Sequence, residues 1–190
     1  MQRVSWMSVA LLIASTLIVA GCGGGGASDG SGNGNGGDGA TPQTSAADMP
    51  TEVFAAAPPG DVVPLIDAKT AAAPGDRVVF EARIGGRVEP FLDKQAIFFV
   101  TDPSIPDCSQ LHGDTCPTPW DYCCEPKDNL LKHMATVQIV DADARPLAMS
   151  ARGQHGLEPG RTVLIEGTVG SKEDGGAFVV NAESIYVLEG

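Results

Sequence analysis

The sequence predicts an all-β domain, a small antiparallel barrel of five or six strands, in a chain of 190 residues. Two observations predict it. Apolar side chains alternate with other side chains in several short segments after residue 76, and turn residues separate these segments at regular spacing. With apolar residues at 43% of the chain, the composition is that of an ordinary globular protein. Residues 76–190 are therefore expected to form one domain with its own core.

The alternation begins at residues 77–84, where Val78, Phe80, Ala82 and Ile84 occupy every second position. Such spacing places these four side chains on one buried face of a strand. The pair Gly85-Gly86 then indicates a sharp bend or bulge. A short helix is expected before this strand, and further strands are expected after it. The helix is expected at 65–72, the first strand is expected to resume at 87–89, and the further strands are expected at 95–101, 135–141, 147–151, 161–169, 177–180 and 182–188.

The N-terminal segment has the pattern of an export signal. Arg3 precedes an apolar run at 6–20, which is 15 residues long and too short for the roughly 20 residues that a membrane span needs. The run ends in Val19-Ala20-Gly21-Cys22, which resembles a bacterial lipobox. The resemblance implies removal of residues 1–21 and attachment of lipid to Cys22. It places the protein outside the cytoplasm, anchored to the membrane, and Gly23 favours the outer membrane. The alternative is an ordinary signal peptide with Cys22 incidental.

Composition divides the rest of the chain. Residues 22–50 form a Gly-rich and Ser-rich tether, in which ten of the eighteen residues from 23 to 40 are glycine. Such a segment buries too little apolar surface to offset its ordering entropy, so we expect it to be disordered. Residues 51–75 are a lead-in with the short helix, and residues 76–190 are the barrel, with a cysteine-rich insertion at 102–133.

Motifs in the barrel region resemble known proteins. The glycine-bent first strand, its hairpin partner and the late Leu-x-Pro-Gly-Arg-x-Val-x-Ile-x-Gly and Val-Val-x-Ala-x-x-Ile segments resemble an OB-fold over about residues 76–188, apart from the insertion. The stretches Ile84-Gly85-Gly86-Arg87 and CPTPWDYCC at 116–124 resemble uncharacterised bacterial lipoproteins and secreted proteins. The first resemblance implies a fold, and neither implies an activity.

The insertion holds four cysteines within 17 residues, Cys108, Cys116, Cys123 and Cys124. An exported chain with an even number of cysteines is expected to form disulfides, and four cysteines allow three pairings. Bonding Cys123 to Cys124 would close a strained ring. The two pairings that join Cys108 and Cys116 to the adjacent pair are therefore favoured, and both remain open. The interpretation we favour is a structural knot, with no metal and no cofactor.

The alternative for the insertion is a copper or zinc site, or a thiol-redox centre. Soft ligands lie near one another in the sequence, because His112 falls between the first two cysteines and His133 ends the insertion. The candidate ligands are Cys108, His112, Cys116, Cys123, Cys124 and His133. The sequence contains no Cys-x-x-Cys motif, which weakens this alternative.

Charge and motif content limit the function. Residues 61–190 carry 20 acidic and 11 basic side chains, a net charge of −9, and aromatic residues make up only 5% of the whole chain. This balance disfavours nucleic acid as a partner. Ser150 and His155 have no evident acidic third member nearby, so no enzyme is expected. The sequence thus predicts a lipid-anchored, non-catalytic binding or envelope-structural module whose protein or small-molecule ligand is unknown.

Overall fold

The computed structural model describes residues 49–111, 115–174 and 176–188. The predicted signal peptide, Cys22, nearly all of the tether and His112 lie outside the described residues. The strands of the described part are β1 (Val63–Pro64), β2 (Arg77–Ile84), β3 (Ile97–Thr101), β4 (Met134–Gln138), β5 (Thr162–Lys172) and β6 (Phe178–Val187). Its helices are α1 (Leu65–Ala71) and α2 (Lys127–Lys132), with short 3-10 helices η1 (Thr51–Val53), η2 (Cys108–Gln110), η3 (Pro119–Asp121) and η4 (Gln154–Gly156).

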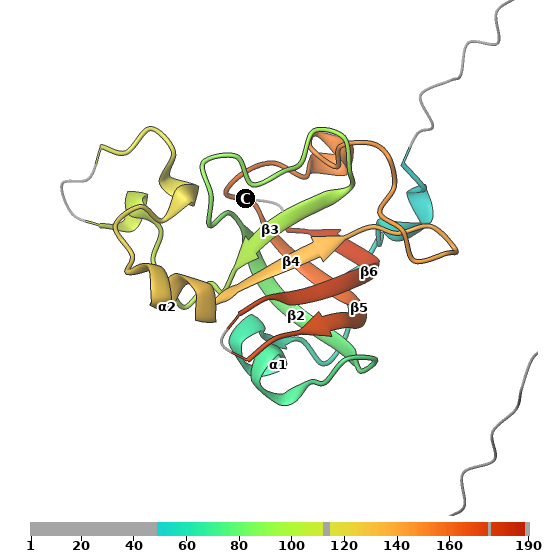
Figure 1. The fold of residues 1–190 in the computed structure, drawn as a ribbon. Helices are drawn as coiled ribbons and strands as arrows, with labels where there is room; N and C mark the ends of the chain where they lie inside the picture. Colours follow the sequence, from blue (N-terminus) through green and yellow to red (C-terminus); the bar gives the residue numbers. More distant parts are fainter. Residues whose placement is uncertain (1–48, 112–114, 175, 189–190) are drawn as a thin grey trace, which may run out of the picture. The chain divides into compact units, whose positions relative to one another are not determined.

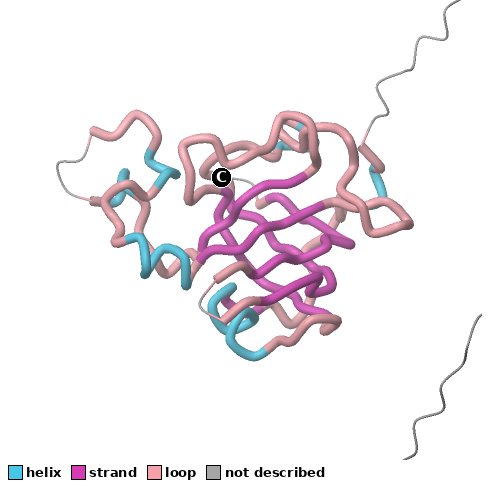
Figure 2. The backbone as a smooth tube through the Cα atoms, viewed as in Figure 1, coloured by secondary structure: helices cyan, strands magenta, loops and turns pink. Residues whose placement is uncertain are grey.

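Five strands close into a barrel (Figures 1 and 2). Their order is β2-β3-β4-β6-β5, and β2 pairs with β5 as well as with β3, so the sheet returns to its first strand. The β2–β5 pairing is antiparallel and runs from Arg77 opposite Thr168 to Arg83 opposite Thr162. The short strand β1 adds a sixth member beside β2. The predicted all-β, OB-like barrel is confirmed.

Two pairings differ in direction from the expected antiparallel pattern. Strands β4 and β6 run parallel, with Val137 opposite Val180, and β1 is parallel to β2. Parallel neighbours need a crossover connection, and residues 139–177, which include β5, provide it between β4 and β6. Alternation within one strand indicates which face is buried but not the direction of the partner strand. The sequence pattern therefore did not predict the two parallel pairings.

The core consists of alternate residues from the barrel strands. In β2, Val78, Phe80, Ala82 and Ile84 are all buried, as the alternation predicted. The other barrel strands contribute fully buried side chains that include Phe98, Val100, Val137, Ile165, Phe178, Val180 and Ile185. Burial of each large apolar side chain contributes about 1.5–3 kcal/mol, so these strands supply a core of their own.

Several predicted boundaries change in the structure. The chain turns away at Gly86, which has a φ of 90°, so residues 87–89 do not continue β2. Residues 147–151 form no strand; the Leu147 carbonyl accepts the Ala96 N–H and the Leu147 N–H donates to the Ile139 carbonyl, without a continuous ladder to a neighbouring strand. The segments expected at 177–180 and 182–188 form the single strand β6. No helix of the described part is both long and apolar enough to span a bilayer.

Candidate metal centre

The cysteine-rich segment lies between two barrel strands. β3 ends at Thr101 and β4 begins at Met134, so the interval between them is residues 102–133. In Figure 1 this segment (yellow to orange) lies to one side of the barrel, and α2 lies at the start of β4. Three short helices, η2, η3 and α2, form its regular structure within the described residues.

Helix α1 holds both ends of the insertion. The Asp102 side chain is fully buried, and its Oδ2 accepts the backbone N–H of Ile66 at 2.7 Å. Lys69 is 8% exposed, and its Nζ donates to the carbonyl oxygens of Leu131 and Met134, each at 2.8 Å. Burial lowers the pKa of Lys69. Because Asp102 at the start of the insertion and Leu131 near its end both bond to α1, the two ends of the insertion are fixed beside the barrel.

The glycine pair that follows β2 contacts the CPTPWDYCC stretch. The Gly86 N–H donates to the Trp120 carbonyl oxygen at 2.8 Å, and Trp120 Nε1 donates to the Val88 carbonyl at 3.0 Å. A Cβ atom at Gly85 would lie 2.4 Å from that same Trp120 oxygen, which is closer than real Cβ contacts. Glycine at position 85 is therefore required for this approach. The two stretches that resemble secreted proteins thus pack against each other.

A second connection lies beside Cys108. Arg83 of β2 forms an ion pair with Asp107, and the two side chains are only 16% and 14% exposed. Asp107 Oδ1 also accepts the backbone N–H of Ser109 at 3.0 Å, which caps η2 at the residue before Cys108. Tyr122 is 1% exposed; burial raises its pKa to about 12, against the opposing effect of the Arg83 guanidinium. The barrel therefore fixes the backbone on both sides of the cysteines.

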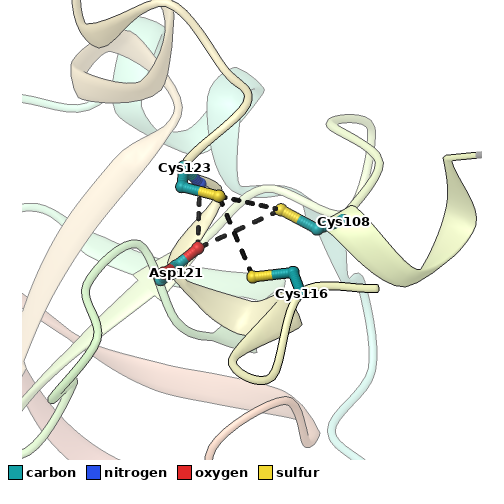
Figure 3. A group of neighbouring side chains, drawn as sticks. All are labelled: Cys108, Cys116, Asp121 and Cys123. Carbon is teal, nitrogen blue, oxygen red and sulfur yellow. Dashed lines mark hydrogen bonds between the residues drawn. The ribbon is translucent and has the colours of Figure 1, made fainter. Parts of the chain in front are cut away.

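The cysteine sulfur atoms lie close together, and Figure 3 shows three of these side chains, Cys108, Cys116 and Cys123. Cys108 Sγ lies 3.7 Å from the sulfur of Cys123 and 3.9 Å from that of Cys124. Cys123 Sγ lies 3.9 Å from the sulfur of Cys116 and 3.9 Å from that of Cys124. Cys108 is 1% exposed, whereas Cys123 and Cys124 are both exposed. The group therefore has a buried member on the barrel side and an open edge.

Asp121 belongs to the same group. Four potential ligand atoms lie within 4.8 Å of one another, one each from Cys108, Cys116, Asp121 and Cys123. Asp121 Oδ1 accepts the Cys123 N–H at 2.9 Å, and its Oδ2 accepts the Thr118 hydroxyl at 2.9 Å. Asp121 is not among the ligands predicted from the sequence. The signal that was available is the Thr118-x-x-Asp121 spacing, which suits a side chain that closes a tight turn.

The sulfur spacing is that of metal ligands. A tetrahedral Zn²⁺ with bonds of about 2.3 Å to sulfur requires sulfur–sulfur distances of about 3.8 Å. A disulfide requires about 2.05 Å. The expected disulfides are not formed in the described part of the chain. The sulfurs of Cys108, Cys116 and Cys123 converge with the Asp121 carboxylate, and the Cys124 sulfur lies beside those of Cys108 and Cys123, whereas the expected knot needs two bonded pairs. Hydrogen bonding with Cys108, and then with Cys116 and Cys124, raises the pKa of Cys123.

His133, the histidine of the alternative ligand set that the structure describes, is not part of this group. His133 Nδ1 lies 2.8 Å from the carbonyl oxygen of Asn129 at the end of α2. His155 stacks on Phe54, with ring centroids 4.0 Å apart. His112 lies outside the described residues. Among the residues that the structure describes, the ligand atoms that converge are therefore cysteine sulfurs and one carboxylate.

Comparison of the chain with protein-family models, curated proteins and solved structures gives no match.

Proposed function

We propose that the protein is a metal-binding module in which Cys108, Cys116, Cys123 and Cys124 hold one Zn²⁺ ion. The observation that carries the proposal is the set of sulfur–sulfur distances, 3.7 to 3.9 Å for four pairs. These distances agree with the edge of about 3.8 Å that tetrahedral zinc requires. The metal site, which was the alternative in the sequence analysis, thus becomes the preferred interpretation.

Four thiolate ligands favour zinc over the hard cations. Soft sulfur ligands in a tetrahedral arrangement select zinc or iron, and three of them suit Cu⁺. Mg²⁺ and Ca²⁺ prefer oxygen ligands, of which this group offers only the Asp121 carboxylate. That carboxylate already accepts two hydrogen bonds from its own loop. We therefore assign Asp121 the role of orienting Cys123 rather than that of the fourth ligand.

The metal is a binding partner in this proposal and not a catalyst. Catalytic zinc sites have three protein ligands and an open position for water or substrate, whereas a site with four protein ligands is closed. A non-catalytic role therefore follows from the proposed ligand set. The net charge of −9 over residues 61–190 supports the exclusion of nucleic acid as a partner. The protein or small-molecule ligand of the barrel is not assigned.

We also propose that the module is exported and anchored by lipid on Cys22, with the outer membrane as the favoured location. The lipobox-like Val19-Ala20-Gly21-Cys22 sequence supports this, since it follows an apolar run with the length of a signal peptide. Growth with radiolabelled palmitate tests it. Label is expected on the wild-type chain and not on Cys22→Ser. Equal labelling of the two chains would contradict lipidation at Cys22.

Cobalt substitution tests the metal site. The full chain, extracted in detergent and loaded with Co²⁺, is expected to show strong thiolate-to-cobalt charge-transfer absorption with one ion per chain. Cys123→Ser is expected to weaken this absorption, because one thiolate is lost. Asp128→Asn is the matched control, since Asp128 is an exposed acid of the same insertion. Failure of the wild-type chain to bind Co²⁺ or Zn²⁺ would reject the proposal, and a chain with two disulfides would restore the structural knot.

A further inference from the structure

We propose that this centre gives up its metal by ligand exchange at the exposed edge formed by Cys123 and Cys124, to an acceptor that carries thiols. The inference rests on the proposed function and deepens it, because it turns a bound ion into a transferable one. The acceptor is a dithiol, either a small molecule or a pair of thiols on a protein surface. Three features of the described residues carry it.

The first feature is the unequal exposure of the ligands. Cys108 is 1% exposed and Cys116 is partly buried, whereas Cys123 and Cys124 are exposed. The two exposed sulfurs lie 3.9 Å apart, which makes them one edge of the proposed tetrahedron. An incoming thiolate can therefore reach the ion from the side of this edge without opening the barrel.

The second feature is that the barrel does not depend on the centre for its core. The cluster of buried apolar residues that fills the barrel contains none of the four cysteines. Helix α2, next to the cysteines in the chain, has no buried residue. The two ends of the insertion are held by Asp102 and Lys69 through hydrogen bonds that involve no cysteine. Loss of the ion is therefore expected to leave the barrel folded, in contrast to zinc sites that supply the folding energy of a small domain.

The third feature is the position of the ligands relative to the barrel. Cys108 is buried and follows Asp107, which is paired with Arg83 of β2. Cys123 and Cys124 are exposed at the open edge of the group. We therefore expect the two exposed cysteines to leave the ion before Cys108.

The exchange step is balanced. An acceptor thiol loses its proton to solvent and its thiolate forms a bond to zinc, which can expand to five ligands. The bond between zinc and one of the two exposed sulfurs then breaks, and that cysteine takes up a proton from solvent. The step repeats at the other exposed cysteine with the second thiol of the acceptor, and no electron is transferred. A second acceptor dithiol displaces Cys116 and Cys108 in the same way, and the ion leaves bound to four acceptor thiolates.

The test measures how fast zinc leaves the loaded full chain in detergent when dimercaptosuccinate is added. Zinc that remains on the chain after rapid desalting is measured by elemental mass spectrometry. For direct exchange, a tenfold higher dithiol concentration is expected to give about a tenfold higher rate, since the five-ligand intermediate forms with the acceptor. The circular dichroism of the strands is expected to stay unchanged throughout. A rate independent of dithiol concentration, or loss of the strand signal together with zinc, would overturn the inference.

Two variants test the order of release. Cys124→Ser is expected to retain zinc and to transfer it at least about tenfold faster, because one position on the ion is then held weakly or open. Cys108→Ser is expected to prevent retention of zinc through desalting, with the strand signal of the barrel preserved. Equal transfer rates for Cys124→Ser and the wild-type chain would contradict the assigned edge. If the wild-type chain holds no zinc at the outset, the proposed function itself fails, and this result is distinct from slow or concentration-independent release.

Discussion

The carbonyl oxygen of Trp120 accepts the N–H of Gly86 at 2.8 Å and lies where a side chain at Gly85 would begin. This relationship joins the end of a barrel strand to the loop that carries three of the four cysteines. It explains why two adjacent glycines follow an otherwise regular strand: one lets the loop approach and the other turns the chain with a φ of 90°. The barrel therefore serves as the rigid support on which the cysteine group is positioned.

Replacement of Gly85 by alanine is expected to disturb this contact. The new Cβ would lie 2.4 Å from a backbone oxygen, so the loop or the strand must shift. We expect Gly85→Ala to lower the free energy of unfolding by about 1–3 kcal/mol and to weaken zinc binding. Gly60→Ala is the matched control, because a Cβ there meets no atom within 4 Å. Chemical denaturation and zinc titration of both variants check this, and equal stability of the two would contradict it.

The ion pair between Arg83 and Asp107 is expected to matter more than a surface pair. Its side chains are 16% and 14% exposed, so Arg83→Met leaves the Asp107 carboxylate largely buried without its cation. The expected loss is about 3 kcal/mol in the free energy of unfolding. Arg77→Met, which breaks an ion pair with Glu166, is the control and is expected to change little, because Arg77 is 65% exposed. Urea denaturation measures the loss in the free energy of unfolding for both variants. Equal losses would contradict the expected difference.

Asp121 is expected to act on metal affinity through its position. Asp121→Ala removes the acceptor of the Cys123 N–H, and we expect zinc affinity to fall by about 10-fold to 100-fold. Asp121→Asn keeps an oxygen that can accept this N–H and is expected to restore most of the affinity. Competition with a calibrated chelator provides the measurement. If the asparagine variant binds zinc as weakly as the alanine variant, the carboxylate is a direct ligand and the positioning role is wrong.

Lys69 gives a prediction with a pH dependence. Lys69→Met leaves the Leu131 and Met134 carbonyls without their donor, so we expect a loss of about 1–3 kcal/mol in the free energy of unfolding. Burial, together with the charge of Lys172, lowers the pKa of Lys69 from 10.5. Between the lowered pKa and 10.5, the unfolded chain binds more protons at this residue than the folded chain does. The stability of the wild-type chain relative to Lys69→Met is therefore expected to rise with pH in that window. A stability difference between the two chains that stays constant or falls with rising pH would contradict this expectation.

The fold was largely predictable from the sequence because each barrel strand has a local signature. The alternation of Phe80, Ala82 and Ile84 reports a buried face, and it does so without knowledge of any partner. The parallel pairing of β4 with β6 has no such local signature, since it depends on where a crossover of nearly forty residues returns. The strand expected at 147–151 failed for the same reason, because its backbone partners lie elsewhere in the barrel.

The candidate site was predictable in its residues but not in its geometry. Spacing identified Cys108, Cys116, Cys123 and Cys124 as one set, yet spacing cannot distinguish two bonded pairs from four converging ligands. Asp121 was missed because its role depends on the turn that brings it to Cys123. The contact between Gly86 and Trp120 joins residues that are distant in the sequence, so the bend at the glycines was predicted and its partner was not.

The measurement that tests the central claim most directly is the metal content and thiol state of the full chain isolated from its native cells. Intact mass before and after alkylation under denaturing conditions gives the number of thiols, and elemental analysis of the same sample gives the metal. The account predicts one zinc per chain, with Cys108, Cys116, Cys123 and Cys124 all alkylated once the metal is removed. A chain without metal that resists alkylation, with a mass lighter by four hydrogen atoms, would contradict it and establish two disulfides instead.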